Sequence, residues 1–166
     1  MAHPRPDIGF VPTPSDAVAA MLALAELTPE DRVYDLGCGD GRLLIQAAAV
    51  YGVSGVGVDI NPDLLAQARL DATAAGVGNR LTFLQGNLFE ADVRQATVVL
   101  IYLLPHLNLR LRPHLLGQLQ PGARIISHQF DMDDWPPETT VKLEPSEEDS
   151  VLYCWRISQP PEHTPG

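Results

Sequence analysis

Residues 35–41 read Asp-Leu-Gly-Cys-Gly-Asp-Gly, and this stretch of the 166-residue chain decides the fold. A short strand pattern, 32–36, leads into it, and a helical pattern from Arg42 to Tyr51 follows it. Three glycines at alternate positions let the backbone turn from a strand into a helix while a polar or anionic ligand approaches closely. The stretch therefore predicts an α/β fold in which this turn binds a ligand.

Two common nucleotide-binding loops do not fit the glycine turn. A dinucleotide fingerprint, Gly-x-Gly-x-x-Gly, needs glycine where Arg42 stands, and Asp35 occupies a position that is usually apolar. A Walker loop needs Gly-Lys-Ser or Gly-Lys-Thr, and neither follows. NAD is thus disfavoured and a Walker site is excluded. The alternative, a turn without a ligand, leaves three glycines and two acids at one turn unexplained.

Strand and helix patterns alternate outward from the glycine turn. Strands are predicted at 32–36, 53–59, 81–85, 97–103 and 123–130. Helices are predicted from Thr13-Pro14, with Pro14 as first helical residue, to about Leu27, and at 42–51, 62–75 and 107–119. Residues 139–143 and 150–157 alternate like an antiparallel edge pair. These elements predict a mostly parallel, seven-stranded sheet with helices on both faces and a binding crevice at the carboxyl ends of the strands.

Composition and charge narrow the classes of partner. The length fits a single domain, 1–166, with 159–166 as a frayed tail. A net charge of −10 disfavours nucleic acid, because phosphate binding needs clustered Lys and Arg. The longest apolar run, 98–104, is too short to cross a membrane, and the N-terminus lacks a signal-peptide core. We therefore expect no membrane partner. Two cysteines are too few for a disulfide framework, so we expect a cytoplasmic location.

Asp59 is the second candidate binding residue. It closes the strand that follows the glycine turn, where a carboxylate can accept hydrogen bonds from both hydroxyls of a ribose. Together, the turn and Asp59 suit an adenosine moiety. With an acidic residue before Gly-x-Gly-x-Gly and another acid ending the next strand, the chain resembles the class I S-adenosylmethionine-dependent methyltransferases over nearly its whole length. The resemblance implies their Rossmann-like fold, with S-adenosylmethionine as cofactor.

The same resemblance assigns the cofactor-binding residues. It implies that Asp35 holds the methionine amino group, that Asp59 holds the ribose and that Ile60 packs on the adenine. The residues expected to line the methionine and ribose are Gly37, Gly39 and Gly41. After the third strand the family usually has Gly-Asp, and this chain has Gly86-Asn87. An asparagine oxygen can accept the same bond from the adenine amino group, so Asn87 and the adjacent Leu88 complete the implied site.

Three further segments, 10–14, 101–105 and 127–130, resemble the small protein-lysine methyltransferases of archaea and their bacterial and mitochondrial relatives. This likeness implies that residues 1–14 lie near the cofactor. Phe10 and Thr13 would flank its methionine end, with the Thr13 hydroxyl near the carboxylate. The alternative is that Thr13 only caps a helix.

The acceptor side depends on Tyr102-Leu103-Leu104-Pro105 at the end of the fourth predicted strand. DNA adenine and glutamine methyltransferases carry Asn-Pro-Pro-Tyr or a relative there, and that motif is absent. Tyr102 with two leucines can instead wall a narrow apolar channel, in which burial disfavours the charged form of a lysine amine. Tyr102 is therefore the candidate catalytic residue, and a core aromatic is the alternative.

Other polar groups follow the predicted strands. His106 and His128 are weighed as general bases against a hydrogen-bonding role. The acids Asp131, Asp133 and Asp134 are weighed as metal ligands, but no further ligand is evident from other strands, so no metal is predicted. Residues 131–150 hold eight acids and one lysine, a net charge of −7 that favours a basic protein substrate. The predicted activity is methyl transfer to the ε-amine of a protein lysine. The alternatives are methylation of a small molecule and a cofactor-binding module without turnover.

Overall fold

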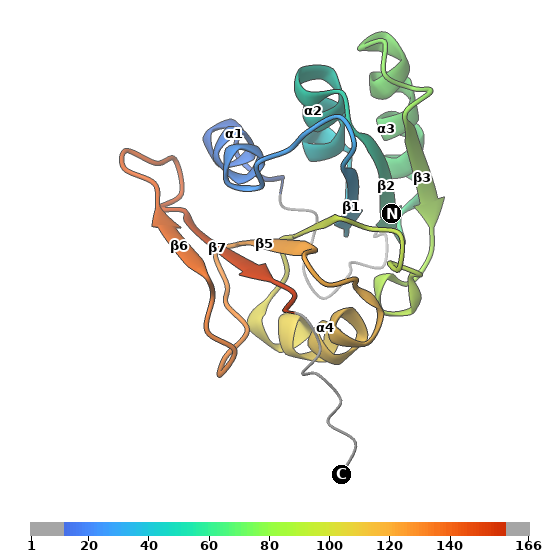
Figure 1. Ribbon diagram of the computed structural model, residues 1–166. Coiled ribbons are helices and arrows are strands. Elements are labelled where there is room, and N and C mark those ends of the chain that lie inside the picture. Colours follow the sequence, from blue (N-terminus) through green and yellow to red (C-terminus); the bar gives the residue numbers. More distant parts are fainter. Residues whose placement is uncertain (1–11, 159–166) are drawn as a thin grey trace, which may run out of the picture.

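Seven strands form one sheet in the order β3-β2-β1-β4-β5-β7-β6, in a computed structural model that describes residues 12–158 (Figure 1). Neighbours among β1 to β5 are parallel, and β7 runs antiparallel between β5 and β6. The sheet confirms the predicted α/β class with its antiparallel C-terminal edge. The strands are β1 (Arg32–Leu36), β2 (Ser54–Asp59), β3 (Leu81–Gln85), β4 (Val98–Ile101), β5 (Arg124–His128), β6 (Thr139–Lys142) and β7 (Val151–Arg156).

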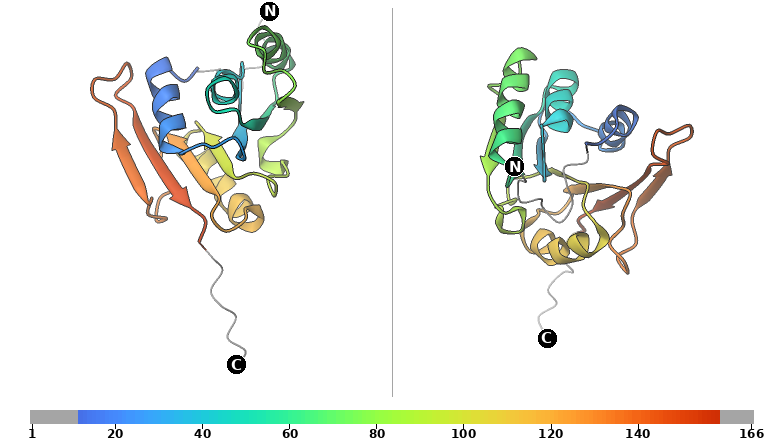
Figure 2. Two further views of the ribbon diagram at one scale, coloured as in Figure 1. Left: turned by 45° about the horizontal axis from the view of Figure 1, so that its top comes forward. Right: turned by 180° about the vertical axis from the view of Figure 1, so that it is seen from behind.

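Helices cover both faces of the sheet (Figure 2). One face carries α1 (Ser15–Leu24), α2 (Arg42–Tyr51) and α3 (Pro62–Ala74), and the other carries α4 (Pro105–Gln118) and the short 3₁₀ helix η1 (Leu88–Glu90). Two buried apolar clusters result, with Met21, Leu44 and Leu100 in one and Leu115 and Trp155 in the other. Among residues 12–158, no helix combines the length and apolarity that a membrane crossing requires.

Local signals explain where the helices around the glycine turn begin and end. Gly41 at φ 79° precedes α2 and Gly52 at φ 74° ends it, both in the left-handed region that favours glycine. The Asn61 side chain accepts hydrogen bonds from the backbone N–H groups of Asp63 and Leu64 and so caps α3. These caps leave the glycine turn and the end of β2 side by side at the carboxyl edge of the sheet.

The start of α1 differs from the prediction. Pro14 occupies the N-cap position with ψ 152°, the helix begins at Ser15, and no side chain caps it. Thr13 is therefore not the cap, because Pro14 is itself extended and its carbonyl oxygen accepts the first helical hydrogen bond, from the Val18 N–H at 2.9 Å. The helix also ends at Leu24 rather than near Leu27, since Glu26 adopts φ 53°.

Two strand ends also differ from the prediction in a way that matters for the site. β4 ends at Ile101 and β5 at His128, so Tyr102 directly follows the sheet. α4 begins at Pro105 rather than Leu107, because proline suits the first helical turn, where its missing N–H is not needed. Phe10 with the rest of 1–11, and the predicted tail 159–166, lie outside the described residues.

Candidate cofactor and acceptor site

The glycine turn presents open backbone at the carboxyl edge of the sheet. Gly37 and Cys38 donate their backbone N–H groups to the carbonyl oxygen of Val58 at 2.8 and 3.0 Å, which holds the turn against β2. Gly37 is exposed with φ 87°, and a Cβ there would meet only Leu103 and Leu88 side-chain atoms, at 3.7 and 3.8 Å. A ligand can therefore reach this backbone from outside the core.

Gly41 has a packing role instead. Its φ is 79°, and a Cβ would lie 3.0 Å from both the Cβ of Ala68 and Cε1 of Phe83. Gly39, with φ 55°, is buried between these two positions and donates its N–H to Asp59. The three glycines predicted to line the cofactor thus serve different purposes in the fold, and Gly37 is the one most open to a ligand.

Asp59 ties the glycine turn to the end of β2. Its Oδ2 accepts from the backbone N–H of Gly39 at 2.8 Å, and its Oδ1 accepts from that of Asn61 at 2.9 Å. The side chain is half-buried, and each carboxylate oxygen keeps a further lone pair. Asp59 can therefore receive two hydroxyl groups while it holds the turn, a second role that the sequence did not suggest.

Asp35 is a buried acid without a cationic partner among residues 12–158. It is 4% exposed and takes part in no ion pair in that range. Burial raises the pKa of Asp35 from 3.8 to about 8, and the nearby charges of Asp59 and Asp40 act in the same direction. A cationic ligand group would offset this cost, which fits the amino group that Asp35 is predicted to hold.

The predicted adenine side lies beyond the end of β2. Ile60 is 58% exposed, which leaves an apolar surface beside the ribose position. The Oδ1 of Asn87 accepts from the backbone N–H of Phe89 at 2.9 Å and caps η1, and one lone pair remains for a ligand. Leu88 is half-buried and faces Gly37. The structure therefore brings the predicted residues Asp59, Ile60 and Leu88 to the same edge as the glycine turn.

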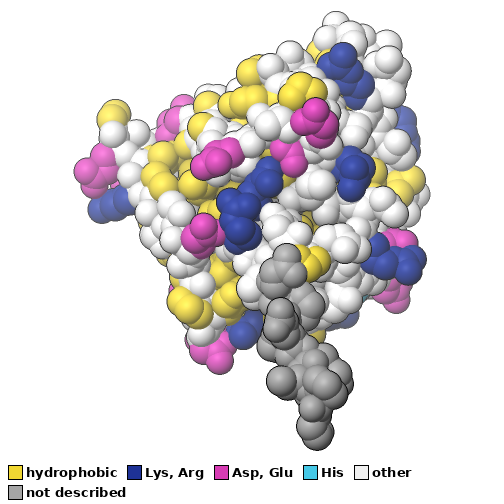
Figure 3. Space-filling model, in the orientation of Figure 1, with side chains coloured by type: hydrophobic (Ala, Val, Ile, Leu, Met, Phe, Trp, Pro, Cys, Tyr) yellow, Lys and Arg dark blue, Asp and Glu magenta, His cyan; other side chains and the backbone are white. Residues whose placement is uncertain are grey.

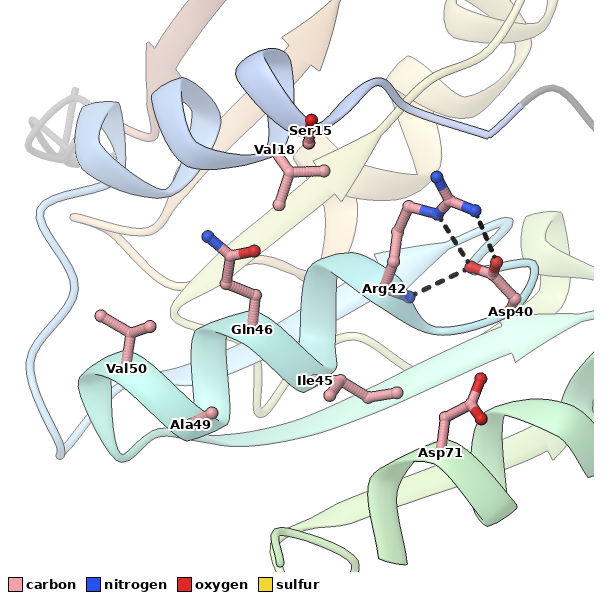
Figure 4. Close-up of a pocket in the computed structure, with 9 residues that line it drawn as sticks. All are labelled: Ser15, Val18, Asp40, Arg42, Ile45, Gln46, Ala49, Val50 and Asp71. Atoms are coloured by element: carbon pink, nitrogen blue, oxygen red, sulfur yellow. Dashed lines mark hydrogen bonds and ion pairs between the residues drawn. The ribbon is translucent and has the colours of Figure 1, made fainter. Parts of the chain in front are cut away.

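The approach to α1 is anchored beside the glycine turn. Arg42 pairs with Asp40 at 2.7 Å (Figure 4). The Nη1 of Arg42 also donates to the carbonyl oxygen of Thr13 at 3.3 Å. Thr13 is 6% exposed. Thr13 thus lies near the turn, and its role beside the cofactor stays a prediction.

A groove on the outer side of the helices is separate from this edge. It has a volume of about 590 Å³ and runs between α1, α2 and α3, as Figure 4 shows. Its lining residues are Ser15, Val18, Asp40, Arg42, Ile45, Gln46, Ala49, Val50 and Asp71. Only the Asp40–Arg42 pair connects it to the glycine turn, and neither Gly37 nor Asp59 lines it.

Tyr102 stands at the acceptor side of the carboxyl edge. It is half-buried, and its ring centroid lies 4.2 Å from that of His128 with an interplanar angle of 65°. Burial, followed by the charge of Glu148, raises the pKa of the Tyr102 hydroxyl. His128 is fully buried and burial lowers its pKa to about 4, so the ring is neutral at physiological pH. His106 is exposed on the first turn of α4.

The segment Ser127-His128-Gln129-Phe130 forms hydrogen bonds to β7, to the 143–150 loop and to α4 that its residue types did not predict. Gln129 adopts φ 74° and forms three hydrogen bonds: its N–H donates to the carbonyl oxygen of Val151 at 2.7 Å, its Oε1 accepts from the Val151 N–H, and its Nε2 donates to the carbonyl oxygen of Glu148 at 3.0 Å. Ser127 and Asn108 bond the carbonyl oxygen of Phe130 from the α4 side. The turn after β5 is therefore held from both faces.

The acidic stretch 131–150 is divided among several parts of the surface, and some of it lies at the carboxyl edge. Asp134 pairs with Arg112 on α4, and Glu138 pairs with Arg156 near the opposite end of β5. The 143–150 loop, between β6 and β7, reaches the carboxyl edge with Glu144, Glu147, Glu148 and Asp149, and Asp131 follows the carboxyl end of β5. Within residues 12–158, no three His, Cys, Asp or Glu side chains are grouped so that they could hold a metal ion.

Comparison with known proteins adds three matches over most of the chain. The profile of the ANTKMT methyltransferase domain matches residues 35–139. A Saccharolobus islandicus protein named protein-lysine N-methyltransferase is 39% identical over 155 residues, which are 93% of this chain and 96% of that protein. The mouse adenine nucleotide translocase lysine N-methyltransferase is 29% identical over 82% of this chain, and the match spans 59% of that protein's length.

Two similar solved structures contain S-adenosyl-L-homocysteine, the form of the cofactor that remains after methyl transfer. A Salinibacter ruber protein described as an RNA methyltransferase, in complex with S-adenosyl-L-homocysteine, is 48% identical with a TM-score of 0.86, covering 94% of this chain and all of that one. A Geobacter sulfurreducens S-adenosylmethionine-dependent methyltransferase, also with S-adenosyl-L-homocysteine, is 27% identical with a TM-score of 0.64. It matches 81% of this chain and 53% of that protein.

Proposed function

Because the chain belongs to the ANTKMT methyltransferase family and is an S-adenosylmethionine-dependent methyltransferase, we propose that it methylates the ε-amine of lysine in a basic protein. The observation that carries the proposal is the wall at the end of β4, where Tyr102 is followed by Leu103, whose side chain faces the open side of Gly37. The 39% identity to a protein-lysine N-methyltransferase of nearly equal length supports it.

The residues at the carboxyl edge fit the cofactor. Asp35 would pair with the methionine amino group, Asp59 would bind the ribose hydroxyls, and Ile60 would pack on the adenine, with Asn87 and Leu88 at the adenine end. Thr13 would stand at the methionine end, together with Phe10. When bound, S-adenosylmethionine supplies a methyl carbon activated by its sulfonium.

The acceptor wall would act on the lysine side chain. Apolar surroundings at Leu103 and Leu104 disfavour the ammonium form, so the amine loses its proton before its lone pair attacks the methyl carbon. The Tyr102 ring would orient that lone pair in line with the methyl–sulfur bond, which would break as the nitrogen–carbon bond forms, with the demethylated cofactor as leaving group. No dedicated base would be required, because the ammonium group would release its proton to solvent water before the amine enters the apolar wall.

The surrounding amides do not favour a planar exocyclic amine such as that of a nucleobase. Asn108 donates to the carbonyl oxygens of Phe130 and Asp131, and the Gln129 amide is bonded to β7 and to Glu148. Both groups of the Gln129 amide and the Nδ2 of Asn108 are thus bonded to the backbone, while the Asn108 Oδ1, which has no partner among residues 12–158, lies on a fully buried side chain. On the face in Figure 3, Lys and Arg side chains occur in small separate groups with acids nearby, and not as a continuous basic surface.

The charge of the 143–150 loop supports a basic acceptor protein. The loop holds four acids, of which Glu144 pairs with the adjacent Lys142 at 3.2 Å and Glu148 lies near Tyr102. Opposite charge accelerates encounter with a lysine-rich surface, whereas a phosphate backbone would be repelled. RNA methylation is the second candidate, favoured by the description of the Salinibacter ruber relative.

Labelled methyl groups distinguish these candidates. The protein is incubated with methyl-labelled S-adenosylmethionine and, separately, with basic proteins, total RNA and a small-molecule extract. We expect label in protein, recovered as methyl-lysine after acid hydrolysis, and less label with the folded Asp59→Ala variant when the cofactor is limiting. Label confined to RNA or to small molecules would contradict the proposal, and cofactor binding without any product would indicate a module without turnover.

A further inference from the structure

We propose that His128 is a positioning residue for methyl transfer, which holds the Tyr102 ring in the acceptor wall and is itself held by Ser150. The inference rests on the proposed function, since it takes Tyr102 to be the residue that orients the acceptor amine. In this role the His128 ring acts by its contact with Tyr102, and it does not accept or donate a proton in the reaction.

Tyr102 needs a side-chain partner because its backbone is outside the sheet. The ladder between β4 and β5 ends with the pair Ile101 and Ser127, one residue before Tyr102 and His128. The two rings then meet edge to face, with centroids 4.2 Å apart and an interplanar angle of 65°. Such aromatic pairs have a preferred geometry, so a fixed His128 ring restricts the orientation of Tyr102.

His128 is held by its backbone, by burial and through one ring nitrogen. Its backbone pairs with Leu152 of β7, and its side chain is fully buried. Nε2 shares a hydrogen bond of 2.7 Å with the Ser150 hydroxyl, which is also fully buried. Ser150 in turn donates its backbone N–H to the hydroxyl of Ser146 at 2.9 Å. The ring is therefore held by a chain of contacts from the 143–150 loop.

The surroundings of His128 do not suit a base. One ring nitrogen is occupied by Ser150, and Nδ1 has no hydrogen-bond partner among residues 12–158. Burial lowers the pKa of His128 to about 4, while the charge of Asp16 on α1 acts weakly in the opposite direction. Glu148, on the loop, acts on the neighbouring Tyr102. A ring that stays neutral above pH 6 is a weak proton acceptor, but its shape is unaffected by pH.

A buried nitrogen without a partner also costs stability, which a phenylalanine at this position would avoid. Phenylalanine would keep the aromatic edge but leave the Ser150 hydroxyl unpaired. Glutamine would do the reverse, because its amide can reach Ser150 while the ring is lost. These two substitutions separate the ring contact from the hydrogen bond.

The test compares His128→Phe, His128→Gln and Ser150→Ala with the wild type on a lysine acceptor. Measurements are kcat and KM, cofactor Kd by calorimetry, and Tm. We expect His128→Gln to lower kcat at least about ten-fold with cofactor Kd unchanged, as expected for a misplaced acceptor. His128→Phe should recover most of that kcat despite a lower Tm, and Ser150→Ala should fall between them.

Two results would overturn the inference. If His128→Gln keeps its kcat, the ring has no positioning role. If His128→Phe loses as much kcat as His128→Gln, and both abolish the same limb of the pH profile of kcat, His128 acts as a base. Wild-type turnover on lysine is measured first, so a failure of the proposed substrate is seen separately; the variants are then measured on the acceptor that does react.

Discussion

Replacing Asp35 with asparagine should make the free protein more stable at neutral pH and yet weaken cofactor binding. Asp35 is 4% exposed, and burial raises its pKa from 3.8 to about 8. The folded state thus binds a proton that the unfolded state releases near pH 4, so the stability from this group is complete below pH 4 and is lost as pH rises towards 8. The full cost of ionisation is roughly 5 to 6 kcal/mol, at about 1.4 kcal/mol per pH unit.

Urea unfolding of both proteins across pH measures this cost. The asparagine side chain cannot ionise, so the free energy of unfolding of Asp35→Asn relative to wild type should rise by about 2 to 3 kcal/mol between pH 5.5 and pH 7.5. Asp31→Asn is the matched control with the opposite sign. Burial acts to raise the pKa of Asp31, but hydrogen bonds from Thr28 and Thr97 and the Arg124 pair outweigh it and lower that pKa. Asp31→Asn should therefore be destabilised relative to wild type at neutral pH.

Calorimetry then tests the link to the cofactor. Because the methionine amino group requires an ionised carboxylate, binding at pH 6.5 should release close to one proton from wild type, visible as a dependence of the binding heat on buffer. Asp35→Asn should release none and should bind about 1.5 to 3 kcal/mol more weakly, since a hydrogen bond between charged groups is lost. Equal affinity, or a stability difference that does not vary with pH, would refute the assigned role of Asp35.

Three other predictions concern the remaining parts of the site. Asp59→Ala should weaken S-adenosylmethionine binding by about 1.5 to 3 kcal/mol in calorimetry, because the ribose loses its acceptor and the Gly39 N–H loses its partner; unchanged affinity in the folded variant would reject the ribose site. Tyr102→Ala should lower kcat on the lysine acceptor more than it changes cofactor Kd, and equal losses would indicate a cofactor contact or misfolding instead. Changing Glu147 and Glu148 to glutamine should raise KM for a basic protein and flatten the salt dependence of kcat/KM. Asp133→Asn with Asp134→Asn serves as the control away from the loop, and an identical salt slope in both pairs would show that the loop only solubilises the protein.

Predictions from local signals were accurate near the glycine turn. β1 and β3 have the predicted bounds 32–36 and 81–85, and α2 the predicted bounds 42–51. Glycine at positive φ, an asparagine cap and the apolar pattern act within a few residues of one another, so the sequence contains their full cause. The prediction of Thr13 as a cap was wrong although threonine and proline indicate the same helix start, because in the structure Pro14 is the extended residue before the helix and α1 begins at Ser15.

The sequence alone determined the α/β class and the meeting of the glycine turn with Asp59, because parallel strands place their carboxyl ends on the same side of the sheet. Only the tertiary structure decided which acidic residues of 131–150 lie at the carboxyl edge and which side chains contact Tyr102. Those contacts, such as His128 with Ser150 and Gln129 with Glu148, join residues on separate strands and loops. They depend on the register of β5 against β7, and the residue types on either strand do not specify which pairs will meet.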